Sequence, residues 1–423
     1  MSTVSREKSK SPFALQPKSS ITCAIKSSDH KIEKNLHRLP DNWTAPPAGT
    51  PGQLYTWGRG GQGQLGHKIA FPSPNCALPV PVRELTNICH VAVGEGQYAC
   101  VLAADSKGRV FSFGNGRCGR LGHGDEKEQH KPKLITALES HFVTCVAAGE
   151  RHAGVVTLEG KAFTWGSNTH GQLGNGNNIS SFAPSVVLAP DGKIPLLGVK
   201  FLDISNEQSA VLLMPSRVAS DQSSNLLTFG NNTHGQLGLG RNVASTSLPG
   251  FVAFPPPVPN SADTSMPTTT TTPASSSNST DSKSSFTEVT QVSMGSLYSG
   301  CVTREGELFL WGLGSYGNLG QGNKKSRHTP GRVSVAREAF VEVACTRGQG
   351  GCKGGLQPTA GGAEGPHTIA ISTSGNVYTM GTCHKGLLGN LGNKTGAFGS
   401  AWDMVAPLVP ATLPPFLQTH IHR

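Results

Sequence analysis

The chain has 423 residues, of which 53 are glycine, and its formal net charge is +10. Charged residues make up only 15% of it, below the roughly 25% that is usual in globular proteins. The glycines have no every-third spacing, which excludes collagen, and no run of about 18 apolar residues predicts a membrane span. Few segments continue far without Gly or Pro, which argues against a long helical bundle. A glycine-punctuated β protein without membrane contact is expected.

The beginning of the chain is basic. Residues 1–38 contain eight Lys or Arg against three Asp or Glu, which is half of the excess positive charge. We predict a disordered basic tail over 1–18, which is either a solvated tail or a segment that makes weak nucleic-acid contacts by attraction to phosphates. No apolar segment typical of a secretory signal follows Met1. The expected compartment is therefore cytoplasm or nucleus, and the many Ser and Lys leave a mitochondrial location open.

A twelve-residue phrase occurs six times and is the main signal in the sequence. It reads YTWGRGGQGQLG at 55–66, FSFGNGRCGRLG at 111–122, FTWGSNTHGQLG at 163–174, LTFGNNTHGQLG at 227–238, FLWGLGSYGNLG at 309–320 and YTMGTCHKGLLG at 378–389. The residues that define its structural role are Trp57, Gly58, Gly114, Trp165, Gly166, Gly230, Trp311, Gly312 and Gly381. Repetition with one pattern predicts one structural unit per copy.

A second phrase precedes the later copies and predicts a β-hairpin. It is clearest as VAVGEGQYACVLAADSKGRV at 91–110, VAAGERHAGVVTLEGKAF at 146–163 and VSMGSLYSGCVTREGELF at 292–309. Each copy has two alternating apolar runs separated by a turn. His152 and His367 share one position of this phrase, where we expect side chains to bond backbone carbonyls between units.

The two phrases together predict a four-stranded unit. In FTWG, residues two apart face the same side, so Phe163 and Trp165 enter one core, and Gly166 permits a turn that a side chain would block. One such sheet cannot bury both faces, whereas a ring of about six can. The predicted fold is all-β: a β-propeller of six or seven four-stranded blades, built from repeats of about 52 residues.

The irregular spacing of the repeats has local causes. A Ser/Thr/Pro-rich tract over 255–286 is too polar to order itself, and a Gly-rich stretch covers 347–365. Both are interpreted as loop insertions that project from one propeller over 19–415, which is followed by a short tail at 416–423. A faint hairpin copy, ITCAIKSSDHKI at 21–32, is a candidate for the strands that close the ring.

No bound group is predicted. The ten cysteines include no CxxC pair, so reduced thiols are expected and no metal site. Three GxGxxG matches fall inside the repeated turn rather than at the start of a helix, so no dinucleotide or other cofactor is expected. We also expect no small-molecule substrate.

The aromatic-x-Trp-Gly strand, the Gln-Leu-Gly that follows, and the preceding Ala-Ala-Gly-x-x-His resemble the repeat of the regulator of chromosome condensation family, over about 54–395. The resemblance implies a β-propeller, usually of seven blades. It also implies a broad choice of functions: exchange factors for Ran and other small GTPases, ubiquitin-ligase substrate modules, scaffolds, a mitochondrial ribosome-assembly factor and a plant UV-B photoreceptor. The photoreceptor uses Gly-Trp-Arg-His-Thr pentads, whereas this chain has GEGQY, GERHA and GSLYS at those positions.

The expected function is therefore that of a noncatalytic protein-binding propeller, a regulatory or scaffold module rather than an enzyme. The alternative is a guanine nucleotide exchange factor for a small GTPase, which the resemblance implies would work by a projecting wedge. The candidate projection is 177–198. The residues expected to contact a partner lie on loops predicted to be exposed on one face, together with one residue of the projection: Glu95, Glu150, Arg151, Glu207, Ser296 and Asp191.

Overall fold

The computed structural model describes residues 51–67, 75–95, 99–256, 286–334, 338–347 and 365–382, and the backbone of 406–407. Within these ranges the chain forms strands and three single-turn 3-10 helices: η1 (Arg117–Gly119), η2 (Thr136–Leu138) and η3 (Pro215–Arg217). The described residues contain no α-helix, and hence no helix long and apolar enough to cross a membrane. The prediction of an all-β protein is confirmed.

The strands form antiparallel sheets, which we number as blades 1 to 6 in chain order. Blade 1 pairs β1 (Tyr55–Arg59) with β2 (Asn75–Pro81). Blade 2 contains β3 (Ile88–Val93), β4 (Cys100–Asp105), β5 (Val110–Gly114) and β6 (Gln129–Leu134). Blade 3 contains β7 (Val143–Ala148), β8 (His152–Thr157), β9 (Ala162–Gly166) and β10 (Ser181–Val186).

The remaining three blades repeat this order. Blade 4 contains β11 (Val199–Ile204), β12 (Gln208–Leu213), β13 (Leu226–Asn231) and β14 (Ser245–Phe251). Blade 5 contains β15 (Val289–Met294), β16 (Tyr298–Thr303), β17 (Leu308–Gly312) and β18 (Arg327–Val333). Blade 6 contains β19 (Phe340–Cys345), β20 (His367–Ser372), β21 (Val377–Gly381) and β22 (Ala406–Pro407).

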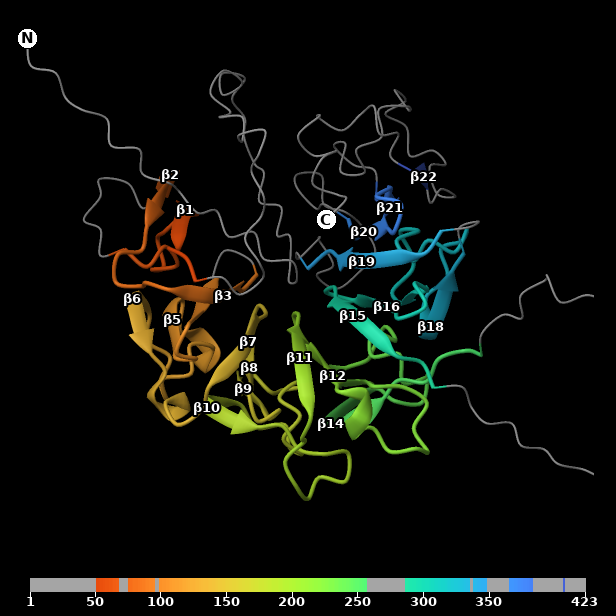
Figure 1. Ribbon diagram of the computed structural model, residues 1–423, viewed down its shortest axis with the longest axis horizontal. Helices are drawn as coiled ribbons and strands as arrows, with labels where there is room; N and C mark the ends of the chain where they lie inside the picture. Colours follow the sequence, from red (N-terminus) through yellow and green to blue (C-terminus); the bar gives the residue numbers. More distant parts are fainter. Residues whose placement is uncertain are drawn as a thin grey trace, which may run out of the picture.

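The blades stand side by side around a common centre (Figure 1). The first strand of each complete blade lies innermost and contacts the first strand of the next, from β3 through β7, β11 and β15 to β19. This is the predicted β-propeller, with each four-stranded blade formed by one repeat. The described residues contain five four-stranded blades and the two strands of blade 1.

The hydrophobic cores lie between neighbouring blades. Leu102 of blade 2 packs with Val155 and Trp165 of blade 3, and Val302 of blade 5 packs with Val343 of blade 6. Equivalent clusters join blades 1 and 2, 3 and 4, and 4 and 5. Blades 2 to 5 are therefore each stabilised by two neighbours, which is how a sheet with two apolar faces is buried in a propeller.

The repeated phrase forms the third strand and the turn after it. Its six first glycines all have positive φ, between +103° and +115°, a region that other residues rarely adopt. Trp165 and Trp311 are fully buried, and each indole Nε1 donates a hydrogen bond to a carbonyl of the preceding blade, at 2.9 Å to Arg120 O and Gln236 O. Trp57 is 57% exposed.

Several predicted segments also lie outside the described residues. They are the tail at 1–18, the faint hairpin at 21–32, the C-terminal tail at 416–423, and nearly all of 255–286 and 347–365. These assignments stay predictions, as do the extent of the propeller over 19–415 and the choice between six and seven blades.

Candidate interaction surface

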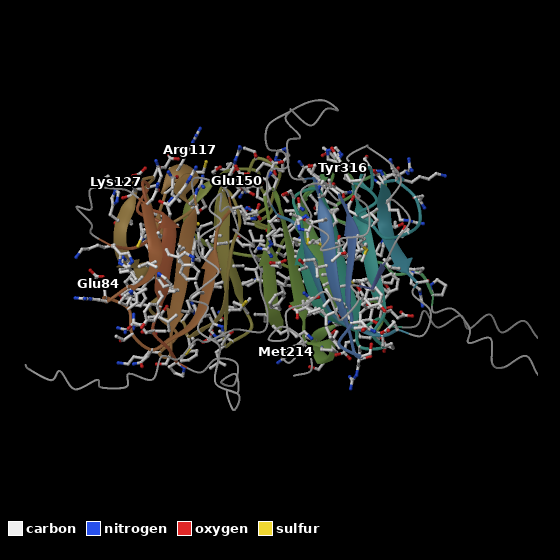
Figure 2. All side chains as sticks on the ribbon, turned by 90° about the horizontal axis from the view of Figure 1, so that it is seen from above. Glu84, Arg117, Lys127, Glu150, Met214 and Tyr316 are labelled. Carbon is white, nitrogen blue, oxygen red and sulfur yellow. The ribbon has the colours of Figure 1, made fainter. Side chains whose placement is uncertain are left out.

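In blades 3 to 5, two connections of each blade come together at one end of the propeller, which we call the loop face. One joins the first strand to the second, as at 149–151, and the other joins the third to the fourth, as at 167–180. The register places both at the same end, since His152 pairs with Gly166 and Gly166 with Ser181. Figure 2 shows Arg117, Glu150 and Tyr316 on this face, and Met214 on the opposite one.

The inner strands close tightly around the axis at the loop face. A Cβ on Gly94 would lie 2.6 Å from the carbonyl oxygen of Gly149 in the next blade, and a Cβ on Gly149 would overlap the carbonyl oxygen of Ser205. Only glycine allows the backbones of adjacent blades to approach this closely. In blades 2 to 6, the residue after this close approach is polar. Together these five residues form a polar ring around the axis: Glu95, Glu150, Asn206, Ser296 and Arg347.

Arg347 links blades across this polar ring. The guanidinium of Arg347, in blade 6, pairs with the carboxylate of Asp203, in blade 4. The Arg347 side chain is only 11% exposed and that of Asp203 only 4%. Asp203 Oδ2 also accepts a hydrogen bond of 2.8 Å from the Met294 backbone N–H of blade 5. Burial opposes the charge on Arg347, but Asp203 and Glu95 raise its pKa. One ion pair therefore ties three blades together.

Glu95 lies within the same buried cluster. Its side chain is 7% exposed, and Ser205 Oγ donates a hydrogen bond of 3.4 Å to its Oε1. Burial raises the pKa of Glu95 to about 8, against the opposing effect of Arg347, and Glu150 raises it further. The expectation that Glu95 lies on an exposed loop is wrong, because the narrowing ring turns this residue toward the axis.

The other predicted contact residues of the loop face surround this cluster. Arg151 is 47% exposed, with its Nε 3.7 Å from Glu150 Oε1. Glu207 Oε2 accepts a hydrogen bond of 2.8 Å from Asn231 Nδ2 and lies 3.6 Å from His170 Nδ1. Ser296 Oγ donates a hydrogen bond of 2.6 Å to the carbonyl oxygen of Arg347.

Asp191 lies apart from these residues. It belongs to the connection that follows β10, and β10 ends at Val186 opposite Phe163, at the far end of the blade from Glu150. Its Oδ1 accepts a hydrogen bond of 3.0 Å from the Lys193 backbone N–H. The predicted set is therefore divided between two ends of the molecule.

Sequence reasoning missed Asp203 and Arg347. The signal for Arg347 is its place in the repeat, since VACTR at 343–347 occupies the positions that VAAGE has at 146–150. Asp203 has no such signal, because its role depends on a residue 144 positions away in the chain.

Side chains at the histidine position of the hairpin phrase bond from blade to blade. Gln208 Nε2 donates to Gly295 O at 2.6 Å, and the Tyr298 hydroxyl donates to His367 O at 2.5 Å, so these two side chains have carbonyl partners in the next blade. His367 Nδ1 itself lies 3.4 Å from Gly365 O, two residues before it in its own blade. His152 differs, because its Nε2 lies 2.8 Å from the hydroxyl of Ser209. Burial lowers the pKa of His152 to about 3, so it is neutral and structural at physiological pH.

Two thiols among the described residues are held in the protonated form. Burial raises the pKa of the Cys100 and Cys145 thiols to about 11, which keeps them from acting as thiolate nucleophiles near neutral pH. Within the part of the chain that the structure describes, no three His, Cys, Asp or Glu side chains gather closely enough to hold a metal ion.

These features define a β-propeller of repeated blades with a polar loop face. The family model of the RCC1-like domain matches residues 48–352, and the chain belongs to this family. It is 28% identical over 302 residues to the ultraviolet-B receptor UVR8 of Arabidopsis thaliana, and 29% identical over 299 residues to the E3 ubiquitin-protein ligase HERC2 of Homo sapiens.

The matches cover most of this chain but less of its relatives. The match to UVR8 covers 71% of this chain and 54% of that protein, and the match to HERC2 covers 70% and 5%. Among solved structures, human WBSCR16 is similar, with a TM-score of 0.52, 21% sequence identity, and coverage of 69% of this chain and 64% of that one. At this identity the last comparison shows the fold alone.

Proposed function

We propose that the protein is a noncatalytic protein-binding propeller, a regulatory or scaffold module of cytoplasm or nucleus, and that its loop face contacts the partner. The observation that carries the proposal is the Arg347–Asp203 pair, which joins blades 4 and 6 across the axis and holds Met294 of blade 5. It fixes the centre of a face whose rim presents exposed charged side chains such as Arg117 and Arg151. A rigid frame carrying exposed polar loops is a common form of binding site.

Affinity capture followed by quantitative mass spectrometry tests this proposal. Arg117→Glu with Arg151→Glu reverses two charges on the loop face. Lys107→Glu with Arg217→Glu is the matched change on the opposite face. All four of these side chains are exposed. We expect the first pair to reduce the capture of specific partners several-fold and the second to leave it unchanged. Equal capture by both variants, with equal thermal stability, would reject the loop face as the contact.

The exchange-factor alternative has one observation in its favour. Within 177–198 the chain forms a small hairpin, in which Leu188 pairs with Pro195 and the Ala189 N–H donates to Ile194 O at 2.8 Å. Ile194 and Leu197 are 57% and 51% exposed, which suits a projection that inserts into a partner. In this case the protein should accelerate GDP release from a small GTPase at catalytic amounts, and Ile194→Asp should abolish the effect. No acceleration across a panel of GTPases would remove this alternative.

A further inference from the structure

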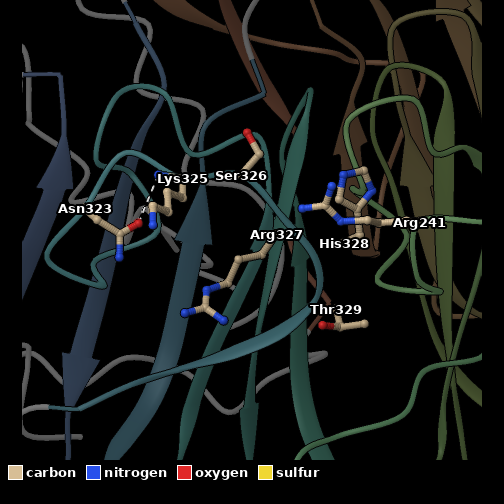
Figure 3. A pocket seen from close by; sticks show the side chains of 7 residues that line it. All are labelled: Arg241, Asn323, Lys325, Ser326, Arg327, His328 and Thr329. Carbon is tan, nitrogen blue, oxygen red and sulfur yellow. Dashed lines mark hydrogen bonds between the residues drawn. The ribbon is translucent and has the colours of Figure 1, made fainter.

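A basic cavity lies between blades 4 and 5, where they meet near the loop face. Its volume is about 380 Å³, and Figure 3 shows the side chains that line it: Arg241, Asn323, Lys325, Ser326, Arg327, His328 and Thr329. Arg241 belongs to the turn after β13, and the other six belong to the turn after β17 and the first residues of β18. Two segments more than 80 residues apart in the chain therefore contribute to one cavity.

The fold builds the same junction at three boundaries of the described blades. Here the Gly240 N–H donates to His328 O at 2.8 Å, and the equivalent bonds are Gly124 to Phe182 at 2.9 Å and Gly176 to Ser247 at 3.0 Å. The cavity is thus held by backbone contacts that belong to the repeat, and its charge is set by the side chains that this repeat carries.

Comparison with the boundaries of blades 2 and 3 and of blades 3 and 4 shows that this boundary carries more positive charge than those two. The position of Arg241 is occupied by Asp125 between blades 2 and 3 and by Asn177 between blades 3 and 4. In blade 5 the strand register pairs Gly312 with Arg327. The equivalent partner is Ser181 in blade 3 and Thr246 in blade 4. Basic residues from both sides meet at this boundary and not at those two.

The positive charge is not neutralised locally. Residues 226–256 and 308–334 contain no Asp or Glu, and among the described residues no carboxylate lies within 4.0 Å of Arg241, Lys325 or Arg327. Unpaired cations held together by a rigid frame repel one another and favour an anion between them.

The donor groups fit a phosphoryl group. Arginine offers a planar fork that matches two phosphate oxygens, and lysine adds a compact charge. Ser326 Oγ accepts a hydrogen bond of 3.2 Å from the Gly314 N–H, which leaves its own hydroxyl hydrogen to donate. We propose that this cavity binds a phosphorylated serine or threonine segment of a protein partner, an assignment that rests on the proposed protein-binding function.

The shape of the site favours a peptide over nucleic acid. Nucleic acid needs basic side chains spaced along a track of phosphates, and single strands also need stacked aromatic rings. Toward blade 2, the equivalent positions at the next two boundaries carry Asn177, between blades 3 and 4, and Asp125, between blades 2 and 3, so the basic surface does not continue around the rim in that direction. A local group of exposed cations around one open cavity suits one phosphorylated segment.

Fluorescence anisotropy with a labelled peptide that carries two phosphoserines, and with its unphosphorylated counterpart, tests the assignment. The phosphopeptide should bind at least about tenfold more tightly, and Arg241→Gln with Arg327→Gln should weaken it roughly tenfold or more. Arg241→Lys with Arg327→Lys should lose part of the affinity, because the charge stays but the forks are lost. Lys107→Gln with Arg217→Gln, on the opposite face, should have no effect.

Three outcomes would overturn the proposal. The first is equal binding of the two peptides. The second is an equal loss of phosphopeptide affinity in the Arg241→Gln with Arg327→Gln variant and in the Lys107→Gln with Arg217→Gln control. The third is displacement of the phosphopeptide by a DNA duplex that binds more tightly. Thermal melting of each variant shows whether a loss reflects unfolding. If the phosphopeptide is rejected while partner capture still depends on Arg117 and Arg151, the cavity assignment fails alone. If it binds but no partner is captured, the proposed function fails instead.

Discussion

At the scale of single residues, the buried charges near the axis are held by pairing. Arg347 and Asp203 gain little net stability from each other, because both lose their hydration on burial. Removal of one partner is different, since the other charge then stays buried without compensation. The ion pair therefore matters more for the position of the loop-face residues than for the total stability.

A double-mutant cycle tests this view of the pair. Asp203→Ala should lower the free energy of unfolding by about 3–5 kcal/mol, because it leaves the Arg347 guanidinium uncompensated. Adding Arg347→Met should restore part of the loss, since the uncompensated charge is then gone. Urea denaturation measures both values. Additive losses in the double variant would show that the two side chains do not act as a pair.

His152 predicts a pH dependence of stability. It titrates near pH 6.5 in the unfolded chain, and burial lowers the pKa to about 3 in the native state. Between these values the unfolded state binds more protons, so the stability from this residue is complete above pH 6.5 and falls as the pH falls, by up to about 1.4 kcal/mol per pH unit.

The matched variant is His152→Gln, because blade 4 has Gln208 at the same position of the repeat. The slope of unfolding free energy between pH 6.5 and pH 4 should become shallower in this variant by up to about 1.4 kcal/mol per pH unit. His170→Gln, a change of a partly exposed histidine on the loop face, is the control. A slope that is unchanged in His152→Gln would mean that another group controls acid sensitivity.

At the scale of the element, two glycines are required for different reasons: one because a side chain would clash with the next blade, the other because of its backbone conformation. A Cβ on Gly149 would overlap the Ser205 carbonyl oxygen, whereas Gly124 has a φ of +82° and nothing within 4 Å of an added Cβ. We expect Gly149→Ala to cost about 3 kcal/mol, because backbone of the next blade must move, and Gly124→Ala about 1 kcal/mol from backbone strain. Chemical denaturation of both variants measures the difference, and the reverse order would contradict this account of the ring.

Strands and turns were the part of the structure that the sequence predicted best, because each repeat determines its own blade locally. Gly166 and Trp165 perform in blade 3 what their equivalents Gly312 and Trp311 perform in blade 5. The loop face was predicted only in part, since the burial of Glu95 and the reach of Arg347 depend on how tightly the ring closes. Asp191 was predicted on the projection over 177–198, and its connection leaves from the other end of the blade.

At the scale of the whole molecule, the cores are a series of separate clusters between adjacent blades. Leu102 and Val155 belong to the cluster of blades 2 and 3, whereas Val343 belongs to that of blades 5 and 6. Energy in such repeated folds is approximately a sum of units and their nearest-neighbour interfaces. Communication between distant blades must then pass through the ring one interface at a time, or through the axial Arg347–Asp203 pair.

Truncations in these cores test that arrangement. Val155→Ala and Val343→Ala, both at fully or almost fully buried positions, should each cost about 1–3 kcal/mol, and their losses should add to within about 0.5 kcal/mol. Val155→Ala with Leu102→Ala should deviate from additivity by about 1 kcal/mol, because these side chains belong to one hydrophobic cluster. Denaturant unfolding of the singles and doubles gives the coupling. Strong coupling between blades 3 and 6 would mean that the axial pair, and not the chain of neighbouring cores, carries the mechanical connection across the propeller.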